Sequence, residues 1–193
     1  MKPVIIIDLN SGNLLSLENA LRRNDLPLSR IQQPEAYDFS GDEILVLPGQ
    51  GRFAFISERM NDLGWRHFLT DWISRGGHLV GICVGMQILF EGSDEDPKAA
   101  GLGYFQGRCQ RLQHPKTPMV GWARLDSDKL NMKDQYAYFV NSYAVSDSPS
   151  CTAKVTYGQS FCVAVQKNRV FGFQFHPEKS GRFGRELLHH VCQ

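Results

Sequence analysis

The strongest chemical signal in the chain is a cysteine between two glycines, in the sequence Gly-Ile-Cys-Val-Gly at residues 81–85. A nucleophile on a tight turn between a strand and a helix needs small neighbours, because other backbone comes close to it. Such a turn also places the thiol at the positive end of the following helix, which favours the thiolate. We therefore interpret Cys83 as a candidate nucleophile. The alternative is an ordinary buried core cysteine.

A nucleophilic cysteine needs a base, and His176 has the most suggestive surroundings of the six histidines. It follows the apolar run 171–175 and opens the sequence His-Pro-Glu. Glu178 stands two residues further on, so in an extended chain its carboxylate falls on the same side as His176. That carboxylate can accept from one ring nitrogen and leave the other to face the thiol. The alternative is a strand-end histidine that pairs with a local carboxylate and does nothing more.

Two loops are candidates to supply the backbone N–H groups that stabilise an oxyanion. The N–H of Val84 follows the nucleophile directly at the start of the expected helix. The second donor comes, in enzymes with this kind of turn, from a neighbouring strand-to-helix loop, and Pro-Gly-Gln-Gly at residues 48–51 follows an apolar run. We expect Gly49, Gln50 and Gly51 to share the oxyanion hole with Val84. Taken alone, the same four residues describe a simple turn.

Short apolar runs in the first half of the chain predict the strands that must position these groups. They are typical of strands buried on both faces of a parallel sheet, and they lie at residues 4–7, 44–47 and 79–82. Helical patterns alternate with them, at residues 14–23, at about 55–74 with an interruption near Gly64, and after Cys83. Strands that alternate with helices predict an α/β fold with a parallel sheet.

The second half of the chain changes character, because strand-like runs there follow one another directly. They lie at residues 119–125, 136–140, 152–157, 162–167 and 170–175. Residues 167–169 have the length and the asparagine of a hairpin turn, and a last helix is expected at about 184–191. We predict one α/β domain over residues 1–193, with a mostly parallel central sheet flanked by helices and an antiparallel extension in the second half.

The composition excludes several classes of protein. Of the 193 residues, 42% are apolar and 21% charged, and the net charge is +1, without the clustered basic surface of a nucleic-acid-binding protein. The apolar run at residues 4–7 is too short for a membrane span or a signal peptide. The five cysteines show no paired spacing, so neither a disulfide framework nor a metal site is expected. We expect a cytoplasmic protein with neither nucleic acid nor membrane as a partner.

Three motifs together resemble those of class I (triad) glutamine amidotransferases, and the resemblance runs the full length of the chain. The motifs lie at residues 48–51, 81–87 and 175–178. Within this class the chain is similar to the glutaminase subunit of imidazole glycerol phosphate synthase, on finer signals at residues 11–13, 121–122, 138–143, 164–167 and 176–181. The resemblance implies a flavodoxin-like fold, no cofactor, and a heterodimer with a (β/α)₈ cyclase subunit of histidine biosynthesis.

The resemblance also implies a mechanism and a set of site residues. Cys83 would attack the carboxamide of glutamine, and His176, oriented by Glu178, would move the proton that releases ammonia from the glutamyl thioester. The positions that match the family's substrate contacts are Gln87, Glu95, Ser142 and Tyr143. The positions that match its synthase interface are Asn13, Trp122 and Lys179. Asp94 and Asp96, on either side of Glu95, are expected to belong to a solvated loop.

Three short segments depart from the usual pattern of this family. Gln50 stands where valine is usual, Val120 and Ala123 flank Gly-Trp where methionine and asparagine are usual, and Asn141 stands where histidine is usual. The triad is untouched, but two of the three segments are tied to regulation or to the interface. A paralogous glutaminase that feeds ammonia to a surface-polysaccharide sugar amidotransferase is therefore the alternative function.

Two further classes are less consistent with these residues. A binding or regulatory module that had lost the chemistry would not need to retain Cys83, His176 and Glu178 together. A cysteine peptidase with the same turn would not need Gln87 and Tyr143 at glutamine-holding positions. The sequence therefore favours an amidotransferase over both.

Overall fold

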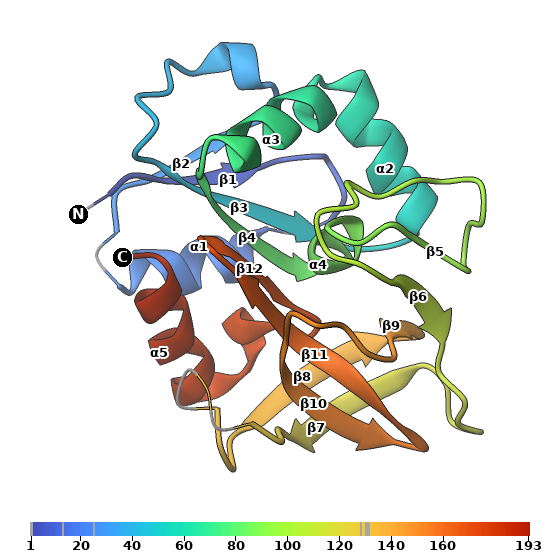
Figure 1. The fold of residues 1–193 in the computed structure, drawn as a ribbon. Coiled ribbons are helices and arrows are strands. Elements are labelled where there is room, and N and C mark those ends of the chain that lie inside the picture. The colour runs from blue at the N-terminus through green and yellow to red at the C-terminus, as the bar shows by residue number, and fades with distance from the viewer. Residues whose placement is uncertain (1, 13, 25, 128, 130–131) are drawn as a thin grey trace.

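A ten-stranded sheet forms the centre of the molecule in the computed structural model, which describes residues 2–12, 14–24, 26–127, 129 and 132–193. Its strands follow the order β2-β1-β3-β4-β12-β11-β9-β6-β5, with β10 paired to β11. Strands β7 and β8 form a separate two-stranded sheet beside it. Figure 1 shows the early, helix-covered half of the fold above the later, strand-rich half.

The first half of the large sheet is parallel, as the apolar runs predict. It contains β1 (Val4–Ile7), β2 (Leu28–Ile31), β3 (Ile44–Gly49), β4 (His78–Cys83) and, from far along the chain, β12 (Val170–Phe173). Every residue of β1, β3 and β4 is buried. Helices on both faces account for this burial and for the continuous apolar sequence of these strands.

Helices cover the two faces of the parallel half in separate pairs (Figure 1). One face carries α2 (Phe53–Asp62) and α3 (Trp65–Ser74), and the other carries α1 (Leu15–Arg22) and α5 (Gly181–Val191), with the short α4 (Val84–Ile88) directly after β4. Gly64 separates α2 from α3 at a φ of +78°, which explains the predicted interruption. The 3₁₀ turns are η1 (Pro34–Ala36) and η2 (Pro177–Lys179). None of the described helices is long and apolar enough to cross a membrane.

The second half is largely antiparallel, as predicted. Its strands in the large sheet are β5 (Gly92–Ser93), β6 (Arg108–Arg111), β9 (Tyr143–Val145), β10 (Cys151–Tyr157) and β11 (Gln159–Lys167), and the small sheet pairs β7 (Met119–Arg124) with β8 (Tyr136–Asn141). The β11–β12 hairpin turns at Asn168, whose φ is +54°. The predicted fold class, a mostly parallel sheet with an antiparallel extension, is confirmed.

Several element boundaries differ from the sequence prediction. The strands β2, β5, β6 and β9 were not predicted, and α5 begins at Gly181 rather than near Gly184. Strand β12 ends at Phe173 rather than Phe175, because the chain then crosses toward the small sheet, where the His176 N–H donates to the Tyr138 carbonyl at 2.9 Å. This crossing brings the His-Pro-Glu segment from the large sheet to the small one.

The register of the parallel strands decides where the site forms. Gly49 at the end of β3 pairs with Cys83 at the end of β4, and β4 pairs on its other side with β12, which leads into His176. The carboxyl ends of three neighbouring parallel strands therefore carry the three motifs. This edge is where open α/β sheets bind ligands.

Candidate active site

Cys83 lies on a sharp, strained turn between a strand and a helix. It is the last residue of β4 and precedes the first residue of α4, with φ +55° and ψ −115°. A non-glycine residue at positive φ is uncommon and costs free energy, and such residues concentrate at functional sites. The turn puts Cys83 at the N-cap position of α4, so the nucleophile candidate lies at the start of a helix, as predicted from residues 81–85.

The glycines around Cys83 are required because backbone passes very close to them. A Cβ on Gly81 would lie 2.8 Å from the Gly85 carbonyl oxygen, and a Cβ on Gly85 would lie 1.9 Å from the Leu47 carbonyl oxygen. A Cβ on Gly49 would lie 2.6 Å from the Gly85 nitrogen. Three motif glycines thus allow β3, β4 and α4 to meet at the turn, as the spacing predicts.

His176 and Glu178 contact each other, but not through the extended chain that the sequence analysis assumed. Residues from Pro177 onward form the 3₁₀ turn η2, and the Glu178 carboxylate reaches back so that its Oε1 lies 2.8 Å from His176 Nδ1. Both side chains are buried, with 5% and 6% of their surface exposed. Ser180 fixes the turn, since its hydroxyl donates to the His176 carbonyl at 2.7 Å. The expected contact between His176 and Glu178 is present, but it is formed by a 3₁₀ turn and not by an extended chain.

The environment of His176 favours its charged form. Burial alone would lower the pKa of His176, but its interactions with Cys83 on one side and Glu178 on the other outweigh burial and raise the pKa to about 10. An imidazolium between a sulfur and a carboxylate is the arrangement of a cysteine–histidine nucleophile with an orienting acid. Nδ1 is held by Glu178, so Nε2 is the ring nitrogen left to exchange a proton with the sulfur.

Replacing Glu178 by glutamine should lower the pKa of His176 from about 10, because the carboxylate that stabilises the imidazolium is lost. With the folded pKa above the ordinary value of 6.5, protonation of His176 stabilises the wild-type fold fully below about pH 6.5 and loses this effect as the pH rises through about 10. NMR titration of the His176 ring in both proteins measures the shift. An unchanged titration would show that Glu178 does not set the charge of His176.

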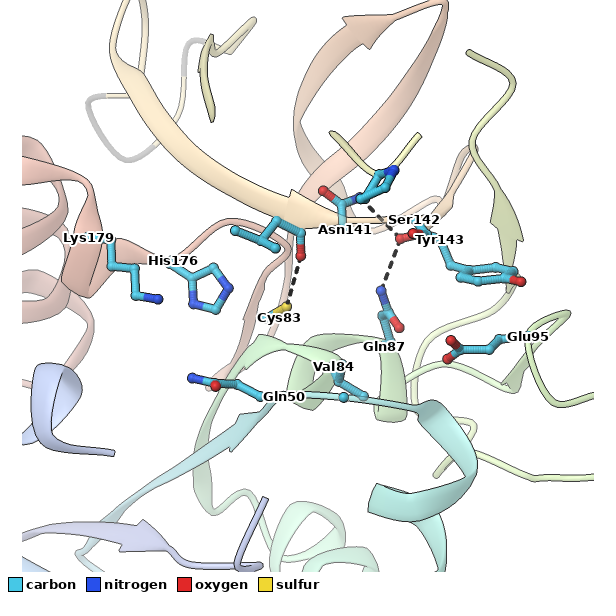
Figure 2. A pocket seen from close by; sticks show the side chains of 13 residues that line it. Gln50, Cys83, Val84, Gln87, Glu95, Asn141, Ser142, Tyr143, His176 and Lys179 are labelled. Carbon is cyan, nitrogen blue, oxygen red and sulfur yellow. Dashed lines mark hydrogen bonds between the residues drawn. The ribbon is translucent and has the colours of Figure 1, made fainter. Parts of the chain in front are cut away.

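The triad cysteine and histidine open into a cavity of about 420 Å³, a volume suited to a small ligand. Its walls come from both halves of the fold and consist of Gln50, Gly51, Cys83, Val84, Gln87, Glu95, Pro118, Val140, Asn141, Ser142, Tyr143, His176 and Lys179. Figure 2 shows the His176 ring directed toward Cys83, with Gln87, Tyr143 and Glu95 on the opposite side of the sulfur. The cavity therefore collects ten of the fourteen residues that the sequence predicts for the site. Of the other four, Gly49, Glu178 and Trp122 are not among its lining residues, and Asn13 lies outside the described residues.

The predicted oxyanion loop lies beside Cys83, but only some of its residues line the cavity. Gln50, Gly51 and Val84 line the cavity, whereas Gly49 ends β3 and packs against the α4 backbone instead. Gly51 has a φ of +93°, a conformation that favours glycine. The Gln50 side chain lies against Gly12, where a Cβ would be 2.7 Å from Gln50 Oε1. Gln50, which stands where the family usually has valine, thus packs this loop against the segment that follows β1.

The expected substrate positions face the cavity from three elements. The Gln87 side chain, from α4, donates to the Tyr143 carbonyl at 3.0 Å, and Ser142 and Tyr143 form the wall at the β8–β9 connection. Glu95 lines the cavity and also accepts from the Phe53 N–H at 2.9 Å. Their roles toward a substrate remain predictions, but their positions around one cavity are consistent with them.

The acidic segment around Glu95 is more structured than expected. The Asp96 carboxylate accepts from the Ala54 N–H at 3.0 Å and forms an ion pair with Arg52, so that Asp96 and Glu95 together cap the N-terminus of α2. The expectation of a solvated loop is therefore wrong for Asp96. It holds better for Asp94, which is half exposed and pairs with Arg108 at 3.4 Å.

The structure adds residues to the site that the sequence analysis did not select. Gln174 is buried and its Nε2 lies 3.9 Å from the Cys83 sulfur. Asn141 donates to the Tyr143 carbonyl at 3.1 Å, while its Oδ1 has no hydrogen-bond partner in the described part of the chain. The sequence could have indicated Gln174, because it is the polar residue of an apolar run and stands two positions before His176. Alternate residues of an extended chain face the same side, which is the side of His176. The sequence marks Asn141 only as a departure from a family pattern.

Two of the three predicted interface positions are exposed in the structure, and the third lies outside the described residues. Trp122, on β7, is 56% exposed and its ring lies 5.9 Å from that of Tyr138. Lys179 is exposed and lines the rim of the cavity on the η2 side. Asn13 lies outside the described residues. Trp122 and Lys179 are thus available to a partner, as their proposed role requires.

Comparison with known proteins identifies the family. The family model described as "Glutamine amidotransferase class-I" matches residues 5–191 of the chain. The chain belongs to this family. Among curated relatives of this amidotransferase, imidazole glycerol phosphate synthase subunit HisH of Thermococcus kodakarensis is 38% identical over 197 residues, covering 96% of each chain. The subunit HisH of Bacillus subtilis is 38% identical over 200 residues, covering 95% of this chain and 92% of that protein.

Solved structures show the same fold at lower sequence identity. A crystal structure of a glutamine amidotransferase has a TM-score of 0.79 at 19% identity and covers 97% of this amidotransferase and 98% of that chain. A structure of PurLQS from Thermotoga maritima has a TM-score of 0.69 at 17% identity, and the match covers 99% of this amidotransferase and 98% of that chain. At such identities these likenesses establish the fold alone.

Proposed function

We propose that this amidotransferase is the glutaminase subunit of imidazole glycerol phosphate synthase, acting as one domain over residues 1–193 in the cytoplasm. It hydrolyses glutamine to glutamate and ammonia, and passes the ammonia to a (β/α)₈ cyclase subunit. The observation that carries the proposal is the meeting of Cys83 and His176 in one small cavity, with Glu178 hydrogen-bonded to the ring of His176. The curated relatives named above, similar over nearly the whole chain, support the choice of pathway.

The first half of the reaction forms a thioester. The Cys83 sulfur attacks the side-chain carbonyl carbon of glutamine, and the oxyanion is held by backbone N–H groups at Val84 and in the Gln50–Gly51 loop. The His176 imidazolium, held by Glu178, gives its proton to the departing nitrogen, which leaves as ammonia. The raised pKa of His176 fits this start, because the reaction then begins with the proton already on the ring.

The second half returns the enzyme to its starting state. His176, now neutral, takes a proton from a water molecule, and the resulting hydroxide attacks the thioester carbonyl. The carbon–sulfur bond breaks, glutamate leaves, and the sulfur again faces an imidazolium. In our proposal Glu95, Ser142, Tyr143 and Gln87 hold the amino-acid head of glutamine, because they line the cavity on the side away from His176.

We assign the partner surface to the exposed face of the small sheet. Val120, Trp122, Tyr136 and Val140 on β7 and β8 are between 40% and 61% exposed, although all four are apolar or aromatic. Val120 pairs across the strands with Val140, which also lines the cavity. A partner seated on this face would therefore cover the mouth of the cavity, where ammonia has to leave, and would lie close to Lys179.

The test is the glutaminase rate of the purified chain, alone and with a histidine-pathway cyclase subunit plus its nucleotide ligand. A low rate that rises strongly with partner and ligand is the expected result. A rate that does not rise, with Cys83 still modified by a glutamine-analogue diazoketone, would leave a working glutaminase and assign it to another synthase, such as one that modifies surface sugars. Absence of both would contradict the glutaminase proposal itself.

Replacing Trp122 by alanine should weaken binding of the cyclase subunit by at least about 2 kcal/mol, which is roughly a 30-fold rise in Kd. The ring is the largest side chain on the exposed face of β7–β8, and such aromatic residues dominate interfaces. Titration calorimetry of the two purified subunits measures the change. Phe55→Ala is the matched control, because Phe55 is 43% exposed but lies on α2. Equal effects of the two substitutions would contradict the proposed surface.

A further inference from the structure

The buried amide of Gln174 contacts the sulfur of the nucleophile. Gln174 is 1% exposed and lies between β12 and His176. Its Nε2 donates to Cys83 Sγ at 3.9 Å, and its Oε1 accepts from Gln87 Nε2 at 3.0 Å. We propose that Gln174 is a further catalytic residue, which supports the negative charge of the Cys83 sulfur through a hydrogen bond that Gln87 and the Tyr143 carbonyl keep in the required orientation. This inference rests on the proposed function, in which Cys83 is the nucleophile.

The orientation of both amides follows from a single backbone carbonyl. The Tyr143 oxygen can only accept a hydrogen bond, so the Gln87 side chain must turn its NH₂ group toward it, at 3.0 Å. The second N–H of that group then points at Gln174, which must present its oxygen. The Gln174 NH₂ group is thereby directed at Cys83. A chain of three hydrogen bonds thus runs from β9 to the nucleophile, and reversing either amide would place like groups face to face.

The sulfur has a different preferred neighbour in each of its charge states. As a thiol, Cys83 donates to the Val140 carbonyl oxygen at 3.9 Å. As a thiolate it has no proton to donate, and that carbonyl dipole becomes unfavourable. The Gln174 N–H has the opposite preference, because a donor stabilises the charged sulfur more than the neutral one. Gln174 therefore favours the thiolate both before attack and when it leaves the thioester.

The same chain of hydrogen bonds restricts what Gln87 can offer a ligand. Its two N–H groups are used by Tyr143 and Gln174, so Oε1 is the polar atom left for the cavity. An oxygen acceptor selects a donor, and the α-ammonium group of an amino acid is such a donor. A glutamine bound there would contact Gln87, the residue that orients Gln174. Binding of the substrate would therefore act on the hydrogen bond that Gln174 donates to the Cys83 sulfur.

The experiment compares wild type with Gln174→Met, which retains the volume but removes the N–H donor. The rate of alkylation of Cys83 by iodoacetamide is followed across pH by mass spectrometry of the Cys83 peptide, with no glutamine present. We expect the rate at pH 7 to fall about tenfold in the variant, as for loss of a hydrogen bond to a charged group. We expect the gap to close at high pH, where the sulfur is ionised in both proteins. The other titratable and charged groups of the cavity, His176, Glu95, Lys179 and Tyr143, are the same in both proteins.

Two further variants make the result decisive. Gln87→Met retains Gln174 but removes its orienting partner, so it should lower the rate at pH 7 in the same direction. Gln166→Met, on the neighbouring strand β11, should behave as wild type. A Gln174→Met rate that is unchanged, or lower by the same factor at every pH, would overturn the inference, because a purely structural role does not depend on the charge of the sulfur. Since alkylation needs no glutamine, a wild-type chain without glutaminase activity would refute the proposed function separately.

Discussion

Replacing Cys83 by alanine should lower glutamine-dependent product formation in the complex by at least about 10⁴-fold, which is typical for removal of a covalent nucleophile. The cavity wall holds no other cysteine among its described residues, and the remaining polar groups cannot form a thioester in its place. Free ammonium salts should still support the partner's reaction, because the synthase site does not use Cys83. The measurement is product formation by the complex with either nitrogen source.

Cys151→Ala is the matched control for this experiment. Cys151 is a free, half-buried cysteine on β10 and does not line the cavity, so both nitrogen sources should support the variant equally well. Loss of ammonium-dependent synthesis in Cys83→Ala would point to a damaged fold or interface. Retention of glutamine-dependent synthesis would remove Cys83 from the mechanism.

Replacing Gly85 by alanine should destabilise the protein by about 3 kcal/mol or more, although alanine is the better helix former by about 1 kcal/mol. The added Cβ would lie 1.9 Å from the Leu47 carbonyl oxygen, so β3 and α4 would have to separate. Because these elements carry the proposed oxyanion loop and the Val84 N–H, we also expect glutaminase activity to be lost. Thermal or denaturant unfolding of the purified variant measures the change.

Gly172→Ala serves as the comparison for Gly85→Ala. A Cβ at Gly172 would approach the side chains of Met86 and Val165 at 2.8 Å, and side chains yield more easily than backbone. We expect a clearly smaller loss of stability there. If both substitutions cost the same, the close approach of backbone at Gly85 would not be what requires glycine.

The sequence was most informative where one local pattern determines the structure. The apolar runs of β1, β3 and β4 predicted buried parallel strands, and Gly81 and Gly85 predicted the turn that holds Cys83 at positive φ. Strand β2 escaped prediction because it lies at the edge of the sheet and contains Ser29 and Arg30, without a buried stripe. Its position depends on pairing with β1, which is a tertiary contact that local composition does not encode.

Within the site, the sequence indicated the chemical groups better than their connections. The contact of His176 with Glu178 was expected from an extended chain, yet it is made across the η2 turn that Pro177 begins. The hydrogen bond from Gln174 to the sulfur is oriented through Gln87 by the carbonyl of Tyr143. Tyr143 lies on β9, 31 positions before Gln174 in the chain. Hydrogen bonds over such distances follow from the sheet order, so a local reading of the sequence could not supply them.

The pairing of β4 with β12 has a consequence for the order in which the protein becomes reactive during synthesis. The proposed nucleophile is present once residue 83 has been made, but its proposed base and orienting carboxylate follow only at residues 176 and 178, after strands β5 to β11. Contacts between such distant segments form late, because closing a long loop is entropically costly. If His176 is the base, as we propose, a nascent chain on the ribosome carries the cysteine without it, and hydrolysis of glutamine has to wait until residues 176 and 178 have been made and folded.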